Sequence, residues 1–443
     1  MSYIVLSDCH YDQRKNSYYY EDAFINDIFL KDNCLHINTK LIKEDILKNY
    51  NFNPIKIESK KEQNDKFSAR TSKKKETFDN IDNKNINDIN LYNSLVNRNP
   101  VGLRNWEGIC YLNAALQCFY HCKPLTKYFL VDLDNKQKEN LGPISKGYYK
   151  LVKGLGSGNI LAANELKKAI RKIDSIFIGT EGKDSKDVVK LLLSELHEEL
   201  LELLEKEDSM VDIKRNVNEF NLNEVYNYFL KNNKDETIIK KIFSFSIKNE
   251  KQCNENCQKY KKSFYNIEYD FSLMFNLRKV YEDTYDQTYQ GIPEISLEDC
   301  LHHYKEQEII ECAYCKANTL QVKNSICFLP KIFIFILSRG YKNEFKCKIN
   351  FREELDMNEF YEPINQNKRD PNTKYKLICA TFAYDWIKKG TGHTVAFCRS
   401  FKQNKKDPKL PYYYLFNDSA SILSDIKEIE DKVPYLLFYE KQE

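Results

Sequence analysis

The sequence lacks an uninterrupted apolar run of the roughly 18 residues that a membrane-spanning helix requires. Its first residues also lack the basic and apolar regions of a signal peptide. Neither charge is in excess, since 68 lysines and arginines face 65 aspartates and glutamates. We therefore expect a cytoplasmic or nuclear protein, with neither a membrane nor a nucleic acid as its main partner. The sequence carries no signal for an oligomeric state.

The composition is that of a folded protein with many thiols. At 443 residues the chain is long enough for two or three domains of roughly 150 residues each. Apolar residues make up 42% of the chain and charged residues 30%. In a large intracellular chain, the 14 cysteines are expected to be free thiols, metal ligands or a nucleophile rather than disulfides.

The composition changes twice along the chain. In residues 1–56, apolar clusters at 24–30 and 41–47 predict one or two short helices in a weakly structured N-terminal segment. Residues 57–99 are rich in lysine, asparagine and aspartate, and they contain few large apolar residues to offset the entropy of ordering. They are predicted to be a solvated linker. The main folded body is expected to span 100–443.

Helical patterns come first in this body, and strand patterns follow. Residues 184–205 carry a broad apolar face, and either Asp184 or Ser185 can cap the helix that this face predicts. Aromatic and aliphatic runs predict later strands at 332–337, 375–382, 394–398, 412–416 and 435–439. This order predicts an α+β fold with a mostly antiparallel sheet.

Cys110 is the first candidate for chemistry. It follows a glycine-containing turn and precedes an apolar pattern of helical spacing, so it is predicted to begin a helix. Unpaired amides and the positive end of the helix dipole favour a thiolate at such a position. A buried, inert thiol is the alternative.

A cysteine nucleophile needs a histidine to take its proton, and a third group to orient that histidine. Among the 7 histidines, His393 follows two glycines at the entrance to a predicted strand, from which a side chain can project into a cleft. Another predicted strand ends at Asn417 and Asp418, and either side chain can accept a hydrogen bond from the imidazole.

Four other cysteines have the spacing of metal ligands. Cys253 and Cys257 are separated by three residues, and Cys312 and Cys315 by two. Each pair offers two thiolates from one tight turn, and two such turns complete a tetrahedral zinc site. From spacing alone, three nearby cysteines remain possible substitutes: Cys300, Cys327 and Cys347.

Taken together, these motifs resemble the ubiquitin-specific protease family, the papain-like cysteine deubiquitinases. GLRNWEGICYLNAALQ resembles the family's cysteine box, and GHTVAF, YYYLFNDS and PYLLFYEK resemble successive parts of its histidine box. KDSKDVVKLLLSELHEEL resembles its QQDAxEFLxxLLxxLHEEL helix. The stretch from LEDCLHHY to FILSRG resembles the segment that leads from its second zinc cysteine pair into a palm strand. The resemblance covers about 100–441, with every box in order.

The resemblance implies a role for each matching residue. Cys110 is implied as the nucleophile, His393 as the general base, and Asn417 as the third catalytic residue, with Asp418 beside it as a substitute. Asn105 is implied to stabilise the oxyanion, and Asp184 to meet the basic tail of ubiquitin. The four spaced cysteines are implied to hold one structural zinc ion, with no catalytic cofactor.

The implied fold is a papain-like hand, with a helical thumb at about 100–215, fingers at about 240–330 and a palm mainly at 331–443. The implied activity is hydrolysis of the bond after the C-terminal glycine of ubiquitin through a thioester, with ubiquitin and ubiquitinated proteins as partners. Departures from the family pattern occur at 107–109 and 182–183, at Thr394 and in LSRG. None removes a proton-transfer group, which favours an active enzyme.

Three alternatives remain at this point. The altered residues beside Asp184 leave room for an isopeptidase that acts on a SUMO-like modifier. The altered loop at 107–109 leaves room for a catalytically silent ubiquitin-binding scaffold. A zinc-ribbon protein that binds nucleic acid is disfavoured by the near-neutral charge balance.

Overall fold

The chain divides into two compact units, 1–75 and 76–443, which are described separately. In a computed structural model, the described part of the second unit comprises residues 86–106, 108–177, 185–205, 218–232, 237–254, 256–285, 291–306, 308–317, 319–340, 344–384, 393–404, 411–429 and 432–443. In the first unit, the backbone of five short strands is described. Among these residues, no helix is both long and apolar enough to cross a membrane.

The first unit contains strands where the sequence analysis expected short helices. A three-stranded antiparallel sheet has the order β1-β5-β4, formed by Tyr3–Leu6, Cys34–Asn38 and Ile28–Lys31. The short strands β2 (Tyr11–Asp12) and β3 (Ser17–Tyr18) pair with each other. The helix prediction is wrong for 28–30, because a short apolar run does not by itself distinguish a strand from a helix. The second cluster, at 41–47, lies outside the described residues.

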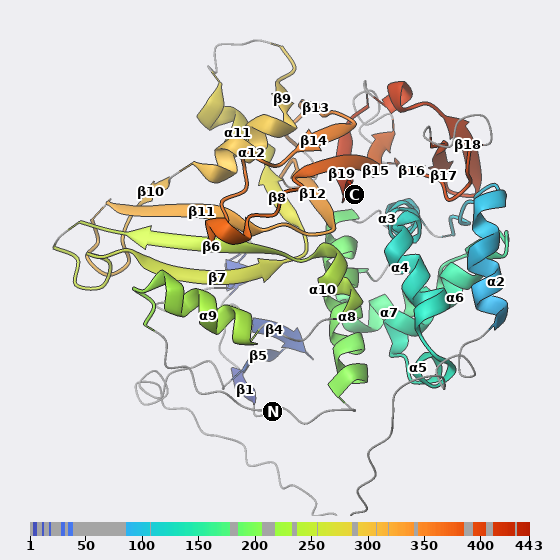
Figure 1. Ribbon diagram of the computed structural model, residues 1–443, viewed down its shortest axis with the longest axis horizontal. Coiled ribbons are helices and arrows are strands. Elements are labelled where there is room, and N and C mark those ends of the chain that lie inside the picture. The colour runs from blue at the N-terminus through green and yellow to red at the C-terminus, as the bar shows by residue number, and fades with distance from the viewer. Residues whose placement is uncertain are drawn as a thin grey trace, which may run out of the picture. The chain divides into compact units, whose positions relative to one another are not determined.

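Helices pack around one central helix in the first half of the second unit (Figure 1). The central helix is α3 (Cys110–His121), and all 12 of its residues are buried. The helices near it include α4 (Lys123–Lys127), α5 (Asn135–Glu139), α6 (Pro143–Gly156), α7 (Asn164–Ile173), α8 (Ser185–Glu205) and α10 (Ile238–Phe243). A helix that is buried on every side needs apolar neighbours all round. The thumb helices and the palm sheet supply them for α3.

The large sheet is antiparallel except at one edge. Its order is β18-β17-β16-β15-β19-β12-β8, and β14 also pairs with β15. These strands span Ala420–Ser424, Tyr413–Asn417, His393–Arg399, Lys374–Tyr384, Pro434–Lys441, Ile332–Ser338, Leu273–Asn276 and Glu354–Asp356, in that order. Among the described strands of this sheet, β8 and β12 are the one pair that runs parallel. The α+β prediction is therefore confirmed.

Both faces of this sheet are covered. In β12, Ile332, Ile334 and Ile336 face the core that contains α3, whereas Phe333, Phe335 and Leu337 face a second core. The second core includes α11 (Leu277–Thr284) and α12 (Leu297–Lys305), next to the parallel pair β9 (Glu294–Ser296) and β13 (Lys348–Asn350). Burial on both faces explains why β12 reads as a continuous apolar run.

A second sheet extends from the palm as the fingers (Figure 1). It is antiparallel in the order β10-β11-β6-β7, formed by Glu308–Ile310, Leu320–Phe328, Phe245–Gln252 and Phe264–Asp270. Helix α9 (Leu222–Asn232) packs on its base through Val225 and Tyr226, which contact Ile267 and Cys327. The fingers and the palm are thus separate sheets.

The predicted linker at 57–99 does not extend through its last part. Helix α2 (Ile86–Ser94) and a 3₁₀ turn (Leu95–Asn97) pack against the thumb, while 57–85 lies outside the described residues. Asp88 is fully buried, and it accepts hydrogen bonds from Tyr149 Oη at 2.7 Å and Lys138 Nζ at 3.2 Å. Lys153 Nζ lies 2.9 Å from its other oxygen. The composition of 57–99 predicted a solvated linker. Composition does not show that a buried carboxylate is paired with lysines far away in the sequence.

Burial would raise the pKa of the Asp88 carboxyl, but hydrogen bonds from Tyr149, Lys153 and Lys138 outweigh burial and lower it. We expect Asp88→Ala to reduce the free energy of unfolding by about 3 kcal/mol, because it leaves the buried Lys138 ammonium unpaired. Urea unfolding at pH 7 measures this loss. Since the folded pKa is lowered, the stabilisation by Asp88 is complete above its unfolded pKa of about 3.9 and is lost as pH falls through the lower folded value.

The matched control is Glu165→Gln, which removes an exposed ion pair with Lys150 at 2.7 Å. This change should alter stability by less than about 0.5 kcal/mol. Equal effects of the two substitutions would show that α2 is not held by the buried carboxylate.

Candidate active site

Cys110 is the first residue of α3, as the sequence predicted, and its side chain is 7% exposed. The turn before it includes Gly108, whose φ of 69° favours glycine. The side-chain oxygen of Asn105 accepts a hydrogen bond from the backbone N–H of Ile109 at 2.9 Å. Asn105 therefore holds the turn that presents Cys110.

His393 begins β16, where it pairs with Tyr384 of β15. Its Nε2 lies 2.7 Å from Asn417 Oδ1 and 3.7 Å from Asp418 Oδ2. Because an amide oxygen only accepts, Nε2 carries the hydrogen and Nδ1 keeps a lone pair that can take a proton. The adjacent backbone N–H of Thr394 donates to the Cys110 thiol. The structure thus brings Cys110, His393 and Asn417 into one site.

Asp418 connects three elements at this site. Its Oδ2 accepts from Asn105 Nδ2 and its Oδ1 from Asn113 Nδ2, both at 2.9 Å. Its backbone oxygen accepts from Leu103 N at 2.8 Å. Asp418 lies in the tight turn between β17 and β18 with a φ of 50°. Its carboxylate therefore orients the Asn105 amide more directly than it orients the imidazole.

The β17–β18 turn packs so closely against the chain before α3 that position 102 must be glycine. A Cβ at Gly102 would lie only 2.1 Å from the backbone oxygen of Asp418.

Asn113 is the residue that sequence reasoning missed. The sequence signal for Asn113 was a polar side chain in a largely apolar helix. A buried amide must find a hydrogen-bond partner, so such a side chain marks a specific contact.

Burial works against the thiolate that the position of Cys110 predicts. Burial raises the pKa of the Cys110 thiol above its usual value, and the negative charge of Asp418 adds to the increase. Hydrogen bonds from the backbone of Thr394 and Tyr111 lower it, but by less. The helix terminus is thus outweighed by desolvation, and the thiol needs a base to become a nucleophile.

Asp184, the predicted contact for the tail of ubiquitin, lies outside the described residues, as do Glu107, Gly182 and Lys183. Helix α8 is described from Ser185, whose hydroxyl donates to the backbone oxygen of Tyr111 at 3.5 Å. This contact places the start of α8 against the start of α3.

The four spaced cysteines come together in the fingers. Their Sγ atoms all lie within 4.8 Å of one another, with 3.6 Å between Cys253 and Cys315 and 3.8 Å between Cys257 and Cys312. A tetrahedral site with Zn–S bonds of about 2.3 Å has sulfur–sulfur distances of about 3.8 Å. The four thiols therefore fit one tetrahedral metal ion.

The three possible substitutes lie in other cores. Cys300 and Cys347 are in the second palm core, and Cys327 packs beneath α9. The predicted choice of four cysteines therefore matches the cluster that the structure forms.

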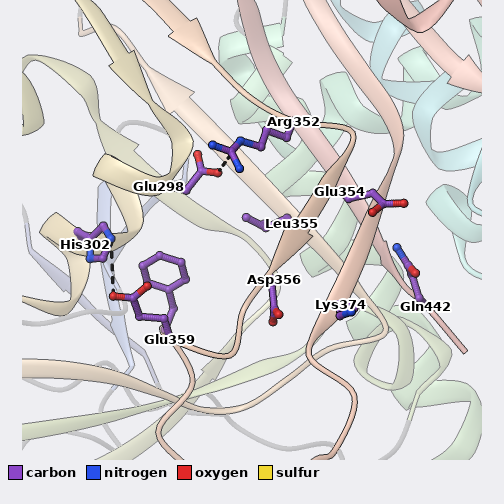
Figure 2. Close-up of a pocket in the computed structure, with 10 residues that line it drawn as sticks. Glu298, His302, Arg352, Glu354, Leu355, Asp356, Glu359, Lys374 and Gln442 are labelled. Atoms are coloured by element: carbon purple, nitrogen blue, oxygen red, sulfur yellow. Dashed lines mark ion pairs between the residues drawn. The ribbon is translucent and has the colours of Figure 1, made fainter.

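A hollow of about 290 Å³ lies at the other end of β15 (Figure 2). Its lining includes the ion pair of Glu298 with Arg352 at 3.6 Å and the contact of His302 with Glu359 at 3.9 Å. Lys374 begins β15 at this hollow, whereas Tyr384 ends the strand beside His393, roughly 33 Å further along. The described residues that line the hollow include no cysteine, and the hollow lies apart from Cys110.

The raised pKa of Cys110 leads to a prediction for the unliganded protein. We expect the rate of Cys110 alkylation by iodoacetamide to keep rising above about pH 8.5, where an ordinary thiol is half ionised. Mass spectrometry of the Cys110 peptide after timed labelling measures this rate, with free N-acetylcysteine as the control. A rate that levels off below about pH 7.5 would show that the thiolate forms without a substrate.

Comparisons with known proteins agree with this geometry. A family model described as "Ubiquitin carboxyl-terminal hydrolase" matches residues 101–439. Ubiquitin carboxyl-terminal hydrolase 2 of Bos taurus is 23% identical over 361 residues, and its human counterpart is 22% identical over 369. Each alignment covers 76% of this chain and 54% of the relative, so the chain spans about half the length of these curated relatives.

Solved structures show the same fold. A SAGA DUB module containing Ubp8 and bound to ubiquitin aldehyde is similar with a TM-score of 0.54 at 18% identity, covering 77% of this chain and 70% of that one. A SAGA DUB module bound to monoubiquitin also has a TM-score of 0.54, at 17% identity, covering 82% and 76%. The family model and these relatives show that the chain belongs to the ubiquitin carboxyl-terminal hydrolase family, within its ubiquitin-specific proteases.

Proposed function

We propose that this protein is a cysteine-dependent deubiquitinase that hydrolyses the isopeptide or peptide bond after the C-terminal glycine of ubiquitin. The observation that carries this proposal is the convergence of Cys110 with His393 and Asn417, through the 2.7 Å contact at His393 Nε2 and the Thr394 N–H on the thiol. Membership of the family supplies the substrate class.

In this proposal, His393 Nδ1 takes the proton of the Cys110 thiol as the sulfur attacks the glycine carbonyl. Asn417 keeps the imidazole in the tautomer that leaves Nδ1 free to accept. The Asn105 amide, held by Asp418, and the Cys110 backbone N–H donate to the oxyanion. His393 then protonates the departing amine, and water cleaves the thioester with His393 as base.

Ubiquitin is the proposed partner because the two similar SAGA modules are bound to ubiquitin aldehyde and to monoubiquitin. The fingers and palm would hold its globular part, and Asp184 its basic tail. A cytoplasmic or nuclear location is proposed for the chain, supported by the 12 free cysteines among the described residues. Isopeptidase action on a SUMO-like modifier and silent binding of ubiquitin remain as outcomes that the test separates.

We also propose that Cys253, Cys257, Cys312 and Cys315 hold one structural zinc ion. The ion would join the turn after β6 to the turn between β10 and β11, which lie on two different hairpins of the fingers. It supplies folding energy rather than chemistry.

The test of the function is the intact mass of the protein after incubation with ubiquitin that carries a C-terminal thiol-reactive electrophile. We expect a single ubiquitin adduct, absent in Cys110→Ala and retained in Cys327→Ala, a buried cysteine in a different core. Cys110→Ala should also reduce cleavage of ubiquitin conjugates by roughly 10⁴-fold or more.

A parallel incubation with a SUMO electrophile separates the alternatives. An adduct with SUMO alone would change the modifier. Binding of ubiquitin without an adduct, by a folded protein, would identify a silent scaffold and contradict the proposed activity.

We propose that Asn417 rather than Asp418 orients the imidazole, supported by the distances from His393 Nε2, which are 2.7 Å to Asn417 Oδ1 and 3.7 Å to Asp418 Oδ2. We expect Asn417→Ala to lower kcat by about 100-fold, and Asn417→Asp to restore part of that loss because it keeps an acceptor near Nε2. Asp418→Ala should cost less in kcat but about 1 kcal/mol in stability, since the buried Asn113 amide loses its shortest hydrogen bond. Steady-state kinetics and urea unfolding of the three variants measure both effects. A larger kcat loss in Asp418→Ala would reverse the assignment.

Elemental analysis tests the zinc site. We expect about one equivalent of zinc in the purified protein and a loss of zinc in Cys315→Ser, because a structural site needs four ligands. Cys300→Ser, which changes a buried cysteine outside the cluster, should keep its zinc. Well under one equivalent in the unmodified protein would contradict the proposal.

A further inference from the structure

The palm sheet ends in an exposed strand, β18. It pairs with β17 on one side, and no other described strand pairs with its second side (Figure 1). In an antiparallel ladder, alternate residues turn their backbone N–H and C=O groups away from the neighbouring strand. No described residue outside β17 forms a backbone hydrogen bond with β18. Free backbone donors and acceptors therefore lie along this edge of the sheet.

The sequence of β18 leaves this edge unprotected. Proteins guard sheet edges against additional strands with charged residues, proline or bulges. β18 reads ASILS, without a charge or a proline, and its register with β17 has no bulge. Its two large side chains, Ile422 and Leu423, are 55% and 57% exposed. By contrast, the edge strand β7 of the fingers carries Glu268 and Asp270, which are both exposed.

A hollow of about 520 Å³ borders β18, and Leu423 forms part of its lining. The charged residues of the lining are three carboxylates and one lysine: Glu353, Asp425, Glu428 and Lys376. Lys376 pairs with Glu353 at 3.0 Å. Asp425 and Glu428 are exposed, and neither forms an ion pair with another described residue. The lining of the hollow is therefore negative overall.

We propose that β18 is the docking strand for an extended, basic segment of a partner protein. Such a segment adds a strand to a sheet, and its main-chain hydrogen bonds supply affinity while its side chains supply specificity. Successive side chains of a strand point to opposite faces, so apolar residues of the segment would lie beside Ile422 on one face and Leu423 on the other. A cationic side chain of the segment would lie beside Asp425 and Glu428.

The charges disfavour a second copy of this chain as the occupant. In a two-fold pairing of β18 with the β18 of another copy, the end of one strand lies beside the start of the other. Asp425 and Glu428 of one copy would then lie near the turn of the other copy that contains Asp418. Like charges that meet across an interface weaken it, whereas a basic segment meets no such repulsion.

The docking strand lies next to the candidate active site. β18 begins at Ala420, directly after the turn that follows Asn417. A segment paired with β18 would therefore lie beside the hairpin that carries Asn417 to His393. The inference goes beyond the proposed function and does not rest on it, because strand addition at β18 requires neither Cys110 nor ubiquitin.

The test is the binding of a fluorescein-labelled peptide in which lysine and valine alternate. Fluorescence anisotropy with the full chain measures its Kd, and we expect saturable binding of one peptide per chain. Two control peptides carry either glutamate in place of every lysine or a fully N-methylated backbone, which cannot donate hydrogen bonds to a sheet edge. Both should bind at least about tenfold more weakly.

Leu423→Lys tests the edge itself. We expect it to weaken peptide binding by about tenfold or more, because the apolar contact is lost and like charges meet. The matched control is Ile309→Lys, at a residue that is 63% exposed on the edge strand β10 of the fingers. This change should leave the Kd unchanged.

The double variant Asp425→Asn, Glu428→Gln tests the charge, and it serves if Leu423→Lys does not fold. The amides keep an acceptor for the Lys427 backbone N–H and for the Ser424 hydroxyl, which the two carboxylates bind now. We expect a several-fold weaker affinity for the lysine–valine peptide. Glu165→Gln, which removes an exposed carboxylate from helix α7, should leave the Kd unchanged.

Hydrogen exchange locates the bound peptide, which should slow amide exchange in Ala420–Ser424. The proposal is overturned by a lack of saturable binding, by unchanged exchange in β18 when the peptide is bound, or by an equal loss of affinity in either control variant. Sedimentation of the full chain as a dimer that Leu423→Lys dissociates would identify a second copy as the occupant, and would also overturn it.

Discussion

The packing of helix α3 between the thumb helices and the palm sheet is the interaction on which the candidate site depends. Phe119 contacts Phe243 of α10 and Phe438 of β19 edge to face, with ring centroids 6.0 and 5.9 Å apart. One side chain of α3 thus contacts both a thumb helix and the palm sheet, and a close-packed interior leaves the helix little room to shift or rotate. The first residue of α3 is Cys110, so this packing also fixes the nucleophile candidate.

Burial of α3 imposes a second constraint, since every polar group on it needs a partner. Gln117 donates to the Val101 backbone oxygen at 3.0 Å, and Asn113 donates to Asp418. Because Asn113 and Gln117 are four residues apart, these bonds fasten the β17–β18 turn and the chain before the helix to the same face of α3. The same turn carries Asn417 to His393. A requirement of the core thus arranges the groups around the thiol.

Cysteine has different chemistry in different parts of this chain because its neighbours differ. At Cys110, burial raises the pKa of the thiol, so a base is needed to take its proton. In the fingers, four sulfurs at tetrahedral spacing suit a metal ion that joins two hairpins. In the core along α3, three fully buried sulfurs lie within 4.8 Å of one another. Burial, the number of neighbouring sulfurs and the available acceptors distinguish the three settings.

The sequence by itself determined the elements whose signals are local. Glycine before an apolar helical pattern placed Cys110 at the start of α3, and alternating or continuous apolar runs located the palm strands to within a few residues. Its motifs also named the four clustered cysteines and, by resemblance, the catalytic residues. Only the tertiary structure decided the bonds of Asp418 to Asn105 and Asn113, which lie 313 and 305 residues away. It likewise decided the burial of Asp88 and the contact of Cys118 with cysteines on β15 and β16. Periodicity and capping report on neighbours along the chain, whereas these contacts depend on how distant elements pack.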